Sequence, residues 1–326
     1  MKKITLKNTI VMAGLVFFLS GCSAGQMLIN NFQGNRYLDN KNYKRGEVVF
    51  RDAVEQDPGD PLANYYLGRF LLAQEKPQLA LPYLQKAVSI DPNKIGYLFW
   101  QGRAQGMSGD LLMERNSYQN ILKIKENHIP ALTYLGHNQF KRKKYKAAQK
   151  TYTKVLSLQP DSPSALFNQA LLAKIRKHPK DARAGWLAYL EKYPVGEFAV
   201  KATGFLNRSG DFSYHSHNIG RLKIALPEIE FESLSAQLAA SSLPSLNIIG
   251  RAAMKMKDGK LQVLVFQQND KKLARSRAIS IREYLLENFP ALTQEKIGIS
   301  WFGEPEKMVI QGKKIQNPQA VHFFSA

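Results

Sequence analysis

The sequence is short of cysteine and of acidic residues. It has one cysteine, Cys22, so no disulfide bond can form between two cysteines of this sequence. Its 26 Asp and Glu residues stand against 46 Lys and Arg residues, which gives a formal net charge of +20 at pH 7. Such a positive excess attracts nucleic acid, anionic lipid or acidic protein surfaces. The 44% hydrophobic content is sufficient for two domains with ordinary cores.

Familiar catalytic motifs are also missing. The sequence contains no His-Glu-x-x-His pair and no glycine-rich phosphate loop. His215 and His217 would suit a metal ion if they lay on a strand, but no Cys or carboxylate stands near them at a ligand spacing. We interpret them as part of a polar linker. The sequence therefore predicts a protein that is not an enzyme and holds no metal or cofactor.

The first 21 residues have the pattern of a secretory signal peptide. A start with three lysines is followed by an apolar run, residues 10–19, that is too short to span a bilayer. The segment Leu19–Cys22 resembles the bacterial lipobox, in which the cysteine is lipidated and becomes the first mature residue. This resemblance implies a lipid on Cys22, and Ser23 after it implies an outer-membrane location facing the periplasm. Export argues against nucleic acid as a partner.

The most regular feature of the chain is a spacing of 34 residues. Proline recurs on this spacing at Pro58, Pro92, Pro160 and Pro194, with Glu126 at the point between. A pair of packed helices needs a small residue where the helices cross, a large apolar residue in the hole between neighbours and a stop at its end. The small residues are Gly68, Gly102, Gly136 and Ala170, and the large ones are Phe50, Leu84, Tyr118, Tyr152 and Trp186. Gly46 and Glu114 depart from the pattern, because the equivalent positions of other repeats hold alanine, Ala80 and Ala148.

These positions resemble the tetratricopeptide repeat family, in five copies over about residues 27–196. The resemblance predicts an all-α solenoid of about five helical hairpins over residues 22–196, with the first helix of each hairpin lining a concave groove. The side chains expected in this groove are Tyr65, Arg69, Phe99, Arg103, Thr133, His137 and Phe167. Aromatic rings mixed with guanidinium groups are typical of protein interfaces, so the groove is expected to bind a peptide or helix of a partner. The alternative for each ring is packing under a neighbouring helix.

Basic residues gather in the turns of the fourth and fifth repeats. They are Lys141, Arg142, Lys143 and Lys144 in the first turn, and Lys174, Arg176 and Lys177 in the second. Stacked repeats would place both turns on one edge as a basic ridge. Such a ridge is either a solvated surface or a docking site for acidic lipid or acidic protein.

The pattern changes after the repeats. Residues 197–221 are polar and fall outside the spacing of 34, so they predict a linker. Strands then alternate with helices over residues 222–326, which indicates a small α/β sandwich domain. Asp270 is a candidate cap for a helix that ends near Asn288, and residues 296–302 predict a strand. Residues 246–250 also predict a strand, and the Asp258–Gly259 dipeptide predicts a hairpin turn.

The segment Leu273–Ala278 and the later Gly303–Glu304 turn resemble the OmpA-like peptidoglycan-associated domain. The resemblance implies that Arg277 contacts peptidoglycan. The family's Gly-x-Thr-Asp motif is replaced by Gly250–Ala253, which removes the carboxylate that would accept from the ammonium group of the ligand. We therefore expect a domain that keeps the fold and has lost or altered its binding to the cell wall.

Both resemblances imply a non-enzymatic, lipid-anchored periplasmic scaffold. Tetratricopeptide lipoproteins of this size resemble assembly factors of secretin-based machines, including type IV and Tad pili, so a role in pilus or secretion-system assembly is expected. The alternative is a tether that binds peptidoglycan through its C-terminal domain and recruits envelope enzymes through its repeats.

Overall fold

The computed structural model describes residues 31–310 and 312–326. The predicted signal peptide and Cys22 lie outside these residues. The chain divides into two compact units, Met1–Gln159 and Pro160–Ala326. Within the described ranges of both units, no helix is long and apolar enough to cross a lipid bilayer.

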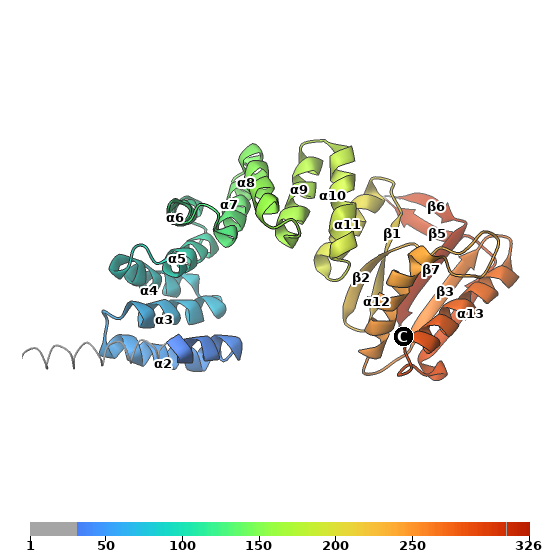
Figure 1. The fold of residues 1–326 in the computed structure, drawn as a ribbon, viewed down its shortest axis with the longest axis horizontal. Coiled ribbons are helices and arrows are strands. Elements are labelled where there is room, and N and C mark those ends of the chain that lie inside the picture. Colours follow the sequence, from blue (N-terminus) through green and yellow to red (C-terminus); the bar gives the residue numbers. More distant parts are fainter. Residues whose placement is uncertain (1–30, 311) are drawn as a thin grey trace, which may run out of the picture. The chain divides into compact units, whose positions relative to one another are not determined.

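The first unit is built from helices (Figure 1). Residues 31–39 are helical. The helices that follow are α2 (Tyr43–Gln56), α3 (Pro61–Ala73), α4 (Pro77–Ile90), α5 (Ile95–Met107), α6 (Leu111–Ile124), α7 (Ile129–Lys141) and α8 (Tyr145–Leu158). Each helix packs against the next along the chain, as the predicted hairpins require.

The first helix of each hairpin ends in a left-handed turn that recurs every 34 residues. The residues with positive φ are Lys41, Glu75, Gly109, Lys143 and Lys177. In the fourth turn, the Lys144 N–H donates to the Gln139 carbonyl at 2.8 Å, which satisfies a carbonyl at the helix end. Gly109 is the one glycine among the five, and the other four adopt a conformation that glycine adopts without strain.

The second helix of each hairpin ends where the prolines predict. Helices α2, α4 and α8 end two residues before Pro58, Pro92 and Pro160. Helix α6 also ends two residues before the equivalent position on the spacing of 34, which is occupied by Glu126. The prediction of the helix stops is confirmed, and the α6 end shows that proline is not the sole cause of the stop.

The small residues meet the large ones as the spacing predicts. A Cβ atom added to Gly68 would lie 2.5 Å from Leu84 Cγ, and one added to Gly136 would lie 2.6 Å from Tyr152 Cε1. These distances are too short for any side chain, so glycine lets the two helices of a hairpin approach. The Tyr152 ring is fully buried as a result.

The two departures from the pattern are matched by residues 24 positions later. A Cβ atom on Gly46 would lie 2.5 Å from the Phe70 ring, so the glycine makes room for Phe70. Glu114 is only 3% exposed, and its Oε2 accepts a hydrogen bond from Asn138 Nδ2 at 2.7 Å. Asn138 lies two repeat lengths after Phe70, so the two residues occupy equivalent positions of their repeats. Each unusual residue is therefore accommodated by the first helix of the following hairpin.

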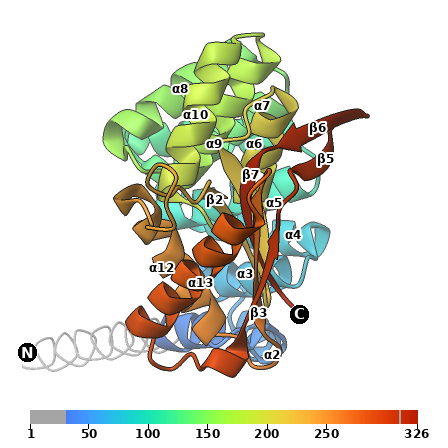
Figure 2. The same cartoon turned by 90° about the vertical axis from the view of Figure 1, so that its right-hand side faces the viewer.

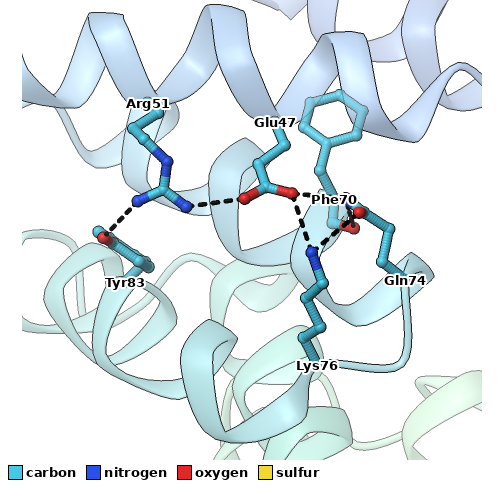
Figure 3. A network of polar contacts seen from close by, with 6 residues as sticks. All are labelled: Glu47, Arg51, Phe70, Gln74, Lys76 and Tyr83. Carbon is cyan, nitrogen blue, oxygen red and sulfur yellow. Dashed lines mark hydrogen bonds and ion pairs between the residues drawn. The ribbon is translucent and has the colours of Figure 1, made fainter.

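A polar network holds α2 to the end of α3 (Figure 3). Glu47 Oε1 accepts from Arg51 at 2.8 Å, and Glu47 Oε2 accepts from Gln74 at 2.8 Å and from Lys76 at 3.4 Å. The hydrogen bond from Arg51, together with Gln74 and Lys76, lowers the pKa of Glu47 against the opposing effect of burial. The network thus bonds one carboxylate to two successive hairpins.

The second unit joins five further α-helices to a sheet. The helices are α9 (Pro163–Ile175), α10 (Pro179–Lys192), α11 (Glu197–Arg208), α12 (Leu243–Met254) and α13 (Lys271–Asn288). The strands are β1 (Tyr214–Ile219), β2 (Leu222–Pro227), β3 (Leu261–Gln267), β4 (Ile297–Phe302), β5 (Glu306–Ile310), β6 (Lys313–Asn317) and β7 (Gln319–Ser325). The main sheet has the order β2-β1-β7-β3-β4, and β5 pairs with β6 in a separate hairpin. The predicted class, a helical solenoid followed by an α/β domain, is confirmed.

Helices α12 and α13 cover one face of the main sheet (Figure 2). Leu246 and Ile249 of α12 share a core with Ala278 and Ile281 of α13, and this core includes Val263 of β3. Residues alternate in β2, so Ala225 points to the other side, where it packs with α11. The second unit therefore has two cores, one on each side of β2.

The segment predicted to be a linker is ordered structure. Residues 197–208 form α11, whose Ala199, Ala202 and Leu206 are buried, and residues 214–219 form β1. The expectation of a linker was wrong, because residues outside the spacing of 34 can still form a helix that buries side chains at helical spacing, here Ala199, Ala202 and Leu206. His215 and His217 lie on β1 and are both buried.

Predictions for the α/β part were right for some elements and wrong for others. Helix α13 begins after Asp270, whose side chain accepts from the Leu273 N–H at 2.8 Å, and β4 lies where a strand was predicted. Residues 246–250 lie inside α12, because a short apolar run fits a buried helix as well as a strand. The Asp258–Gly259 turn connects α12 to β3 and is not a hairpin. Strands β5, β6 and β7 were not predicted.

Candidate functional site

The side chains predicted for the groove begin on α3, where Tyr65 and Arg69 lie one turn apart. Arg69 Nη1 donates a hydrogen bond to Tyr65 Oη at 3.2 Å. The Arg69 guanidinium also lies over the ring of Trp100 from α5, with Cζ 4.5 Å from the ring centroid. The Tyr65 ring contacts Tyr97 of α5, with centroids 5.0 Å apart. Arg69 therefore joins the first helices of two successive hairpins.

The same arrangement recurs between α5 and α7. Arg103 lies over the ring of Tyr134, with Cζ 4.4 Å from the centroid, and Phe99 meets Tyr134 edge-on at 5.3 Å. The rings of Tyr134 and His137 are 5.5 Å apart. Thr133 lies beside Tyr134 on α7 and is half-exposed. We call this set the aromatic–arginine row; it comprises Tyr65, Arg69, Phe99, Trp100, Arg103, Tyr134 and His137.

The sequence missed two members of this row. Trp100 and Tyr134 provide the rings under the two guanidinium groups, and neither was among the predicted groove residues. They lie 34 residues apart, and both are equivalent in the repeat to Tyr66. The spacing therefore contained a signal for them.

Phe167, expected in the same groove, lies in the second unit and is 6% exposed. Its ring packs edge-on against Trp186, Tyr189 and Phe198, with centroids 5.1, 5.4 and 4.8 Å away. It is a core residue of that unit. The alternative interpretation, packing under neighbouring helices, describes this position correctly.

His137 is uncharged at neutral pH. Burial, with the nearby charges of Lys141 and Arg103, lowers its pKa to about 4. Burial raises the pKa of Tyr152, whose hydroxyl lies 2.7 Å from His137 Nδ1 and keeps its proton. His137 therefore accepts a hydrogen bond from Tyr152, and the positive charge of the row comes from Arg69 and Arg103.

The row combines half-exposed rings with fixed cations. Each guanidinium lies over a ring, so less conformational freedom remains to be lost when a partner binds. Arginine keeps several N–H donors at its edge in this position, and these suit carbonyl or carboxylate acceptors of a peptide. The row thus offers aromatic area and guanidinium donors side by side.

The basic turns fall in different units. Lys141, Arg142, Lys143 and Lys144 close α7 in the first unit, whereas Lys174, Arg176 and Lys177 close α9 in the second. Lys143 and Lys177 both occupy the left-handed turn position, which points to one local geometry for both turns. A continuous ridge across them stays a prediction.

Arg277 is an internal residue. It is 4% exposed, and its Nε donates to the Ser235 carbonyl at 2.9 Å. Its Nη1 donates to the side-chain oxygens of Gln267 and Gln319, at 2.5 and 2.8 Å. The guanidinium also lies 4.5 Å from the centre of the Phe231 ring. The segment containing Phe231 and Ser235 would have to move before cell-wall peptide reached Arg277, so the predicted contact lacks an open site.

The residue that stands in the place of the family's aspartate is also internal. Ala253 lies on α12 and is 6% exposed within the core of the α/β part. Asp270 is engaged in capping α13. Two side chains of the sheet, Gln267 and Gln319, and the Ser235 carbonyl from the segment after β2 hold Arg277 in its buried position.

A histidine cluster lies beside the β5–β6 hairpin. His322 Nε2 is 2.7 Å from Glu306 Oε1, and the rings of His215 and His217 lie 5.6 and 6.1 Å from that of His322. His217 Nδ1 accepts from the Phe323 N–H at 3.3 Å. No group of three or more His, Cys, Asp or Glu side chains in the described residues is arranged to hold a metal ion.

Acidification is expected to destabilise the second unit through His217. Burial and the neighbouring His322 and His215 lower its pKa to about 3, whereas an unfolded chain protonates histidine near pH 6.5. Between these values the unfolded state binds a proton that the folded state does not. The free energy of unfolding should therefore fall by about 2 kcal/mol between about pH 7 and about pH 5.

His217→Asn keeps an acceptor for the Phe323 N–H and cannot titrate, so it isolates this effect. Glu306, whose pKa is lowered by His322 against burial, adds loss at lower pH, and Glu228, whose pKa is raised by burial, opposes it. Urea unfolding followed by circular dichroism at both pH values measures the difference. Equal pH dependence in the native chain and the variant would show that His217 is not responsible.

A sequence profile of the tetratricopeptide repeat matches residues 33–95 and 135–197. The matched segments contain the turns at Lys41, Glu75, Lys143 and Lys177, whereas the Gly109 turn and α6 lie between them. The chain therefore contains tetratricopeptide repeats. Among curated proteins, no sequence matches the chain.

Solved structures with a similar fold align with about half of the chain. The pilF protein of Pseudomonas aeruginosa is 18% identical, with 57% of this chain and 86% of that chain covered and a TM-score of 0.49. YrrB, described as a TPR protein with an unusual peptide-binding site, is 16% identical, with 52% and 88% covered and a TM-score of 0.46. MamA from Desulfovibrio magneticus RS-1 is 13% identical, with 51% and 93% covered and a TM-score of 0.47. At these identities the likeness concerns the fold.

Proposed function

Because the first part of the chain consists of tetratricopeptide repeats, we propose that the protein is a scaffold that binds a partner protein through the aromatic–arginine row. The observation that supports this proposal is the repeated pairing of a half-exposed guanidinium with a ring, Arg69 on Trp100 and Arg103 on Tyr134. Tyrosine, tryptophan and arginine are the residues that contribute most binding energy at protein interfaces.

The row suits an extended or helical peptide with acceptor groups. It runs over α3, α5 and α7, so successive side chains of a guest meet successive hairpins. The two arginines supply donors and charge, and the rings supply apolar area that a guest can cover. An acidic or carbonyl-rich segment of a partner matches this surface.

Substituting both arginines tests the proposal. A photoreactive amino acid placed at Thr133 should capture a partner in cells, and Arg69→Gln with Arg103→Gln should weaken capture by about a hundredfold, since each arginine is expected to be a hot spot. Glutamine is chosen because glutamate would bring a carboxylate against the Trp100 ring. Loss of the contacts to the rings costs about 1 kcal/mol each, so circular dichroism must show that the variant is folded.

Arg36→Gln with Arg45→Gln removes the same charge from exposed positions of the first unit and serves as the control. Capture should survive in the control. Undiminished capture in the Arg69 and Arg103 variant would refute the role of the row.

We further propose that the scaffold is anchored by a lipid on Cys22 in the outer membrane, faces the periplasm and serves the assembly of a pilus or secretion system. The support is the resemblance of Leu19–Cys22 to the lipobox and of the repeats to assembly lipoproteins. The identity of the captured protein tests this part. A subunit of a multimeric outer-membrane channel supports it, whereas a cell-wall enzyme would favour the tether instead.

A further inference from the structure

A cavity lies where three helices of the second unit end or begin. Helix α9 ends at Ile175 and α11 ends at Arg208, while α10 begins at Pro179 between them in the chain. The cavity has a volume of about 510 Å³ and is lined by Lys174, Lys177, Arg183, Trp186, Phe205 and Arg208, among others. This volume is in the range of pockets that hold small ligands or peptide side chains. None of the lining residues belongs to the aromatic–arginine row.

The wall of this cavity is aromatic. Trp186 and Phe205 stack with ring centroids 4.9 Å apart and planes inclined by 26°. Trp186 is 2% exposed and anchored in the core by contact with Phe167, so the wall is rigid. Phe205 is half-exposed and supplies the ring that faces the cavity. A flat apolar group fits against such a wall.

The rim of the cavity is strongly basic. Lys174 Nζ lies 3.9 Å from the Phe205 ring centre, and Arg208 Cζ lies 4.8 Å from it. Arg183 pairs with Asp211 at 2.6 Å, which accounts for the charge of that arginine. Within the described ranges, no carboxylate lies within ion-pair distance of Lys174, Lys177 or Arg208. The rim therefore carries three positive charges that form no ion pair within the described residues.

We propose that this cavity, the α9–α11 pocket, binds an acidic peptide segment of a partner protein that carries an aromatic side chain. The aromatic side chain packs against Phe205 and Trp186, and the flanking carboxylates pair with Lys174, Lys177 and Arg208. Opposite charge near these cations relieves their mutual repulsion, and the ring fills the apolar wall. The two halves of the ligand thus match the two halves of the pocket.

A peptide fits this pocket better than a lipid headgroup does. A phosphate headgroup is polar throughout, so it would pair with the rim and leave the aromatic wall without an apolar partner. A peptide with an aromatic residue between acidic ones satisfies rim and wall together. The proposal is independent of the proposed function of the aromatic–arginine row, which lies in the first unit.

The three tryptophans of the chain allow a direct test. Trp100 lies in the aromatic–arginine row, Trp186 in the α9–α11 pocket and Trp301 on β4, so fluorotryptophan in the full chain gives one fluorine resonance for each place. The probe is a blocked peptide, Gly-Asp-Glu-Phe-Asp-Glu-Gly, with an Asn and Gln version as its neutral match. The acidic peptide should shift the Trp186 resonance, and the neutral peptide should not. The shift should weaken with added salt.

Lys174→Gln with Arg208→Gln should weaken this binding about tenfold. Lys141→Gln with Lys144→Gln, which removes two charges from the equivalent turn of the first unit, should leave it unchanged. An equal Trp186 shift with the neutral peptide, or in the Lys174 and Arg208 variant, would overturn the proposal. A shift caused by phosphatidylglycerol vesicles but not by the peptide would overturn it in favour of lipid. Movement of Trp100 alone would overturn it and support only the row.

Discussion

Replacing Arg277 with methionine is expected to lower the unfolding free energy of the α/β part by about 3 kcal/mol. Arg277 donates to the Ser235 carbonyl and to the side-chain oxygens of Gln267 and Gln319, and it is almost fully buried. Methionine fills a similar volume but leaves all three acceptors without this donor. The loss also frees the segment containing Ser235 from α13.

Hydrogen exchange measures this effect locally. Amides of β3 and α13 should exchange faster in Arg277→Met by a factor that corresponds to the lost free energy. Arg275→Met is the matched control, because Arg275 is exposed on the same helix and its guanidinium lies 5.6 Å from the Trp301 ring. The control should lose less than about 1 kcal/mol. Equal protection in the native chain and Arg277→Met would show that the buried hydrogen bonds contribute no net stability.

This result bears on the peptidoglycan tether. Loss of wall retention in an Arg277 variant would be ambiguous, because the same change is expected to loosen the fold. A different comparison separates ligand contact from stability. It measures how much of the native chain is retained on sacculi and how much is retained after the segment 231–238 is altered. The buried state of Arg277 favours a structural role for it.

Asn138→Leu is expected to destabilise the first unit by about 3 kcal/mol, because it leaves the buried carboxylate of Glu114 without its principal donor. Asn138 Nδ2 bonds both Glu114 Oε2 and the Leu111 carbonyl, each at 2.7 Å. The remaining partner of Glu114, the Tyr118 hydroxyl, is 3.4 Å from Oε1. A weak contact of that length does not replace the amide.

Substituting the other member of the pair, Glu114, should have a smaller effect on stability. Glu114→Met removes the charge and keeps the volume, while Asn138 keeps its hydrogen bond to Leu111, so a loss of about 1 kcal/mol is expected. The double variant, Glu114→Met with Asn138→Leu, replaces the polar pair with an apolar one. It should be more stable than Asn138→Leu alone, since apolar pairs of similar volume often replace buried polar pairs without loss.

Urea unfolding of the four chains gives the coupling between the two positions. A double variant that loses the sum of the two single losses would contradict the pairing of Glu114 with Asn138. Gly106 is part of the same arrangement, because a side chain there would collide with the Glu114 carboxylate. A Gly106→Ala chain should therefore lose stability only while Glu114 is present.

The histidine pair shows why some elements escaped prediction. His215 and His217 alternate with exposed residues on β1, which is the pattern of a half-buried strand. Polar side chains at the buried positions hid that pattern, because hydrophobic alternation is the signal that sequence reading uses. Glu306 and His322 give these histidines a polar environment, and they stand about a hundred positions away in the chain.

The sequence by itself determined the helical hairpins, their stops, the glycine positions that face large rings and the two arginines of the aromatic–arginine row. These features depend on contacts between residues at constant separations within a repeat, so their spacing is visible in the chain. Only the tertiary structure decided the burial of Arg277, the order of the sheet and the α9–α11 pocket. In the sheet, β7 lies between β1 and β3, which brings together residues that no period relates. The rim and wall of the pocket come from three helices that meet at their ends, and that meeting depends on how α11 packs against α10 and the sheet.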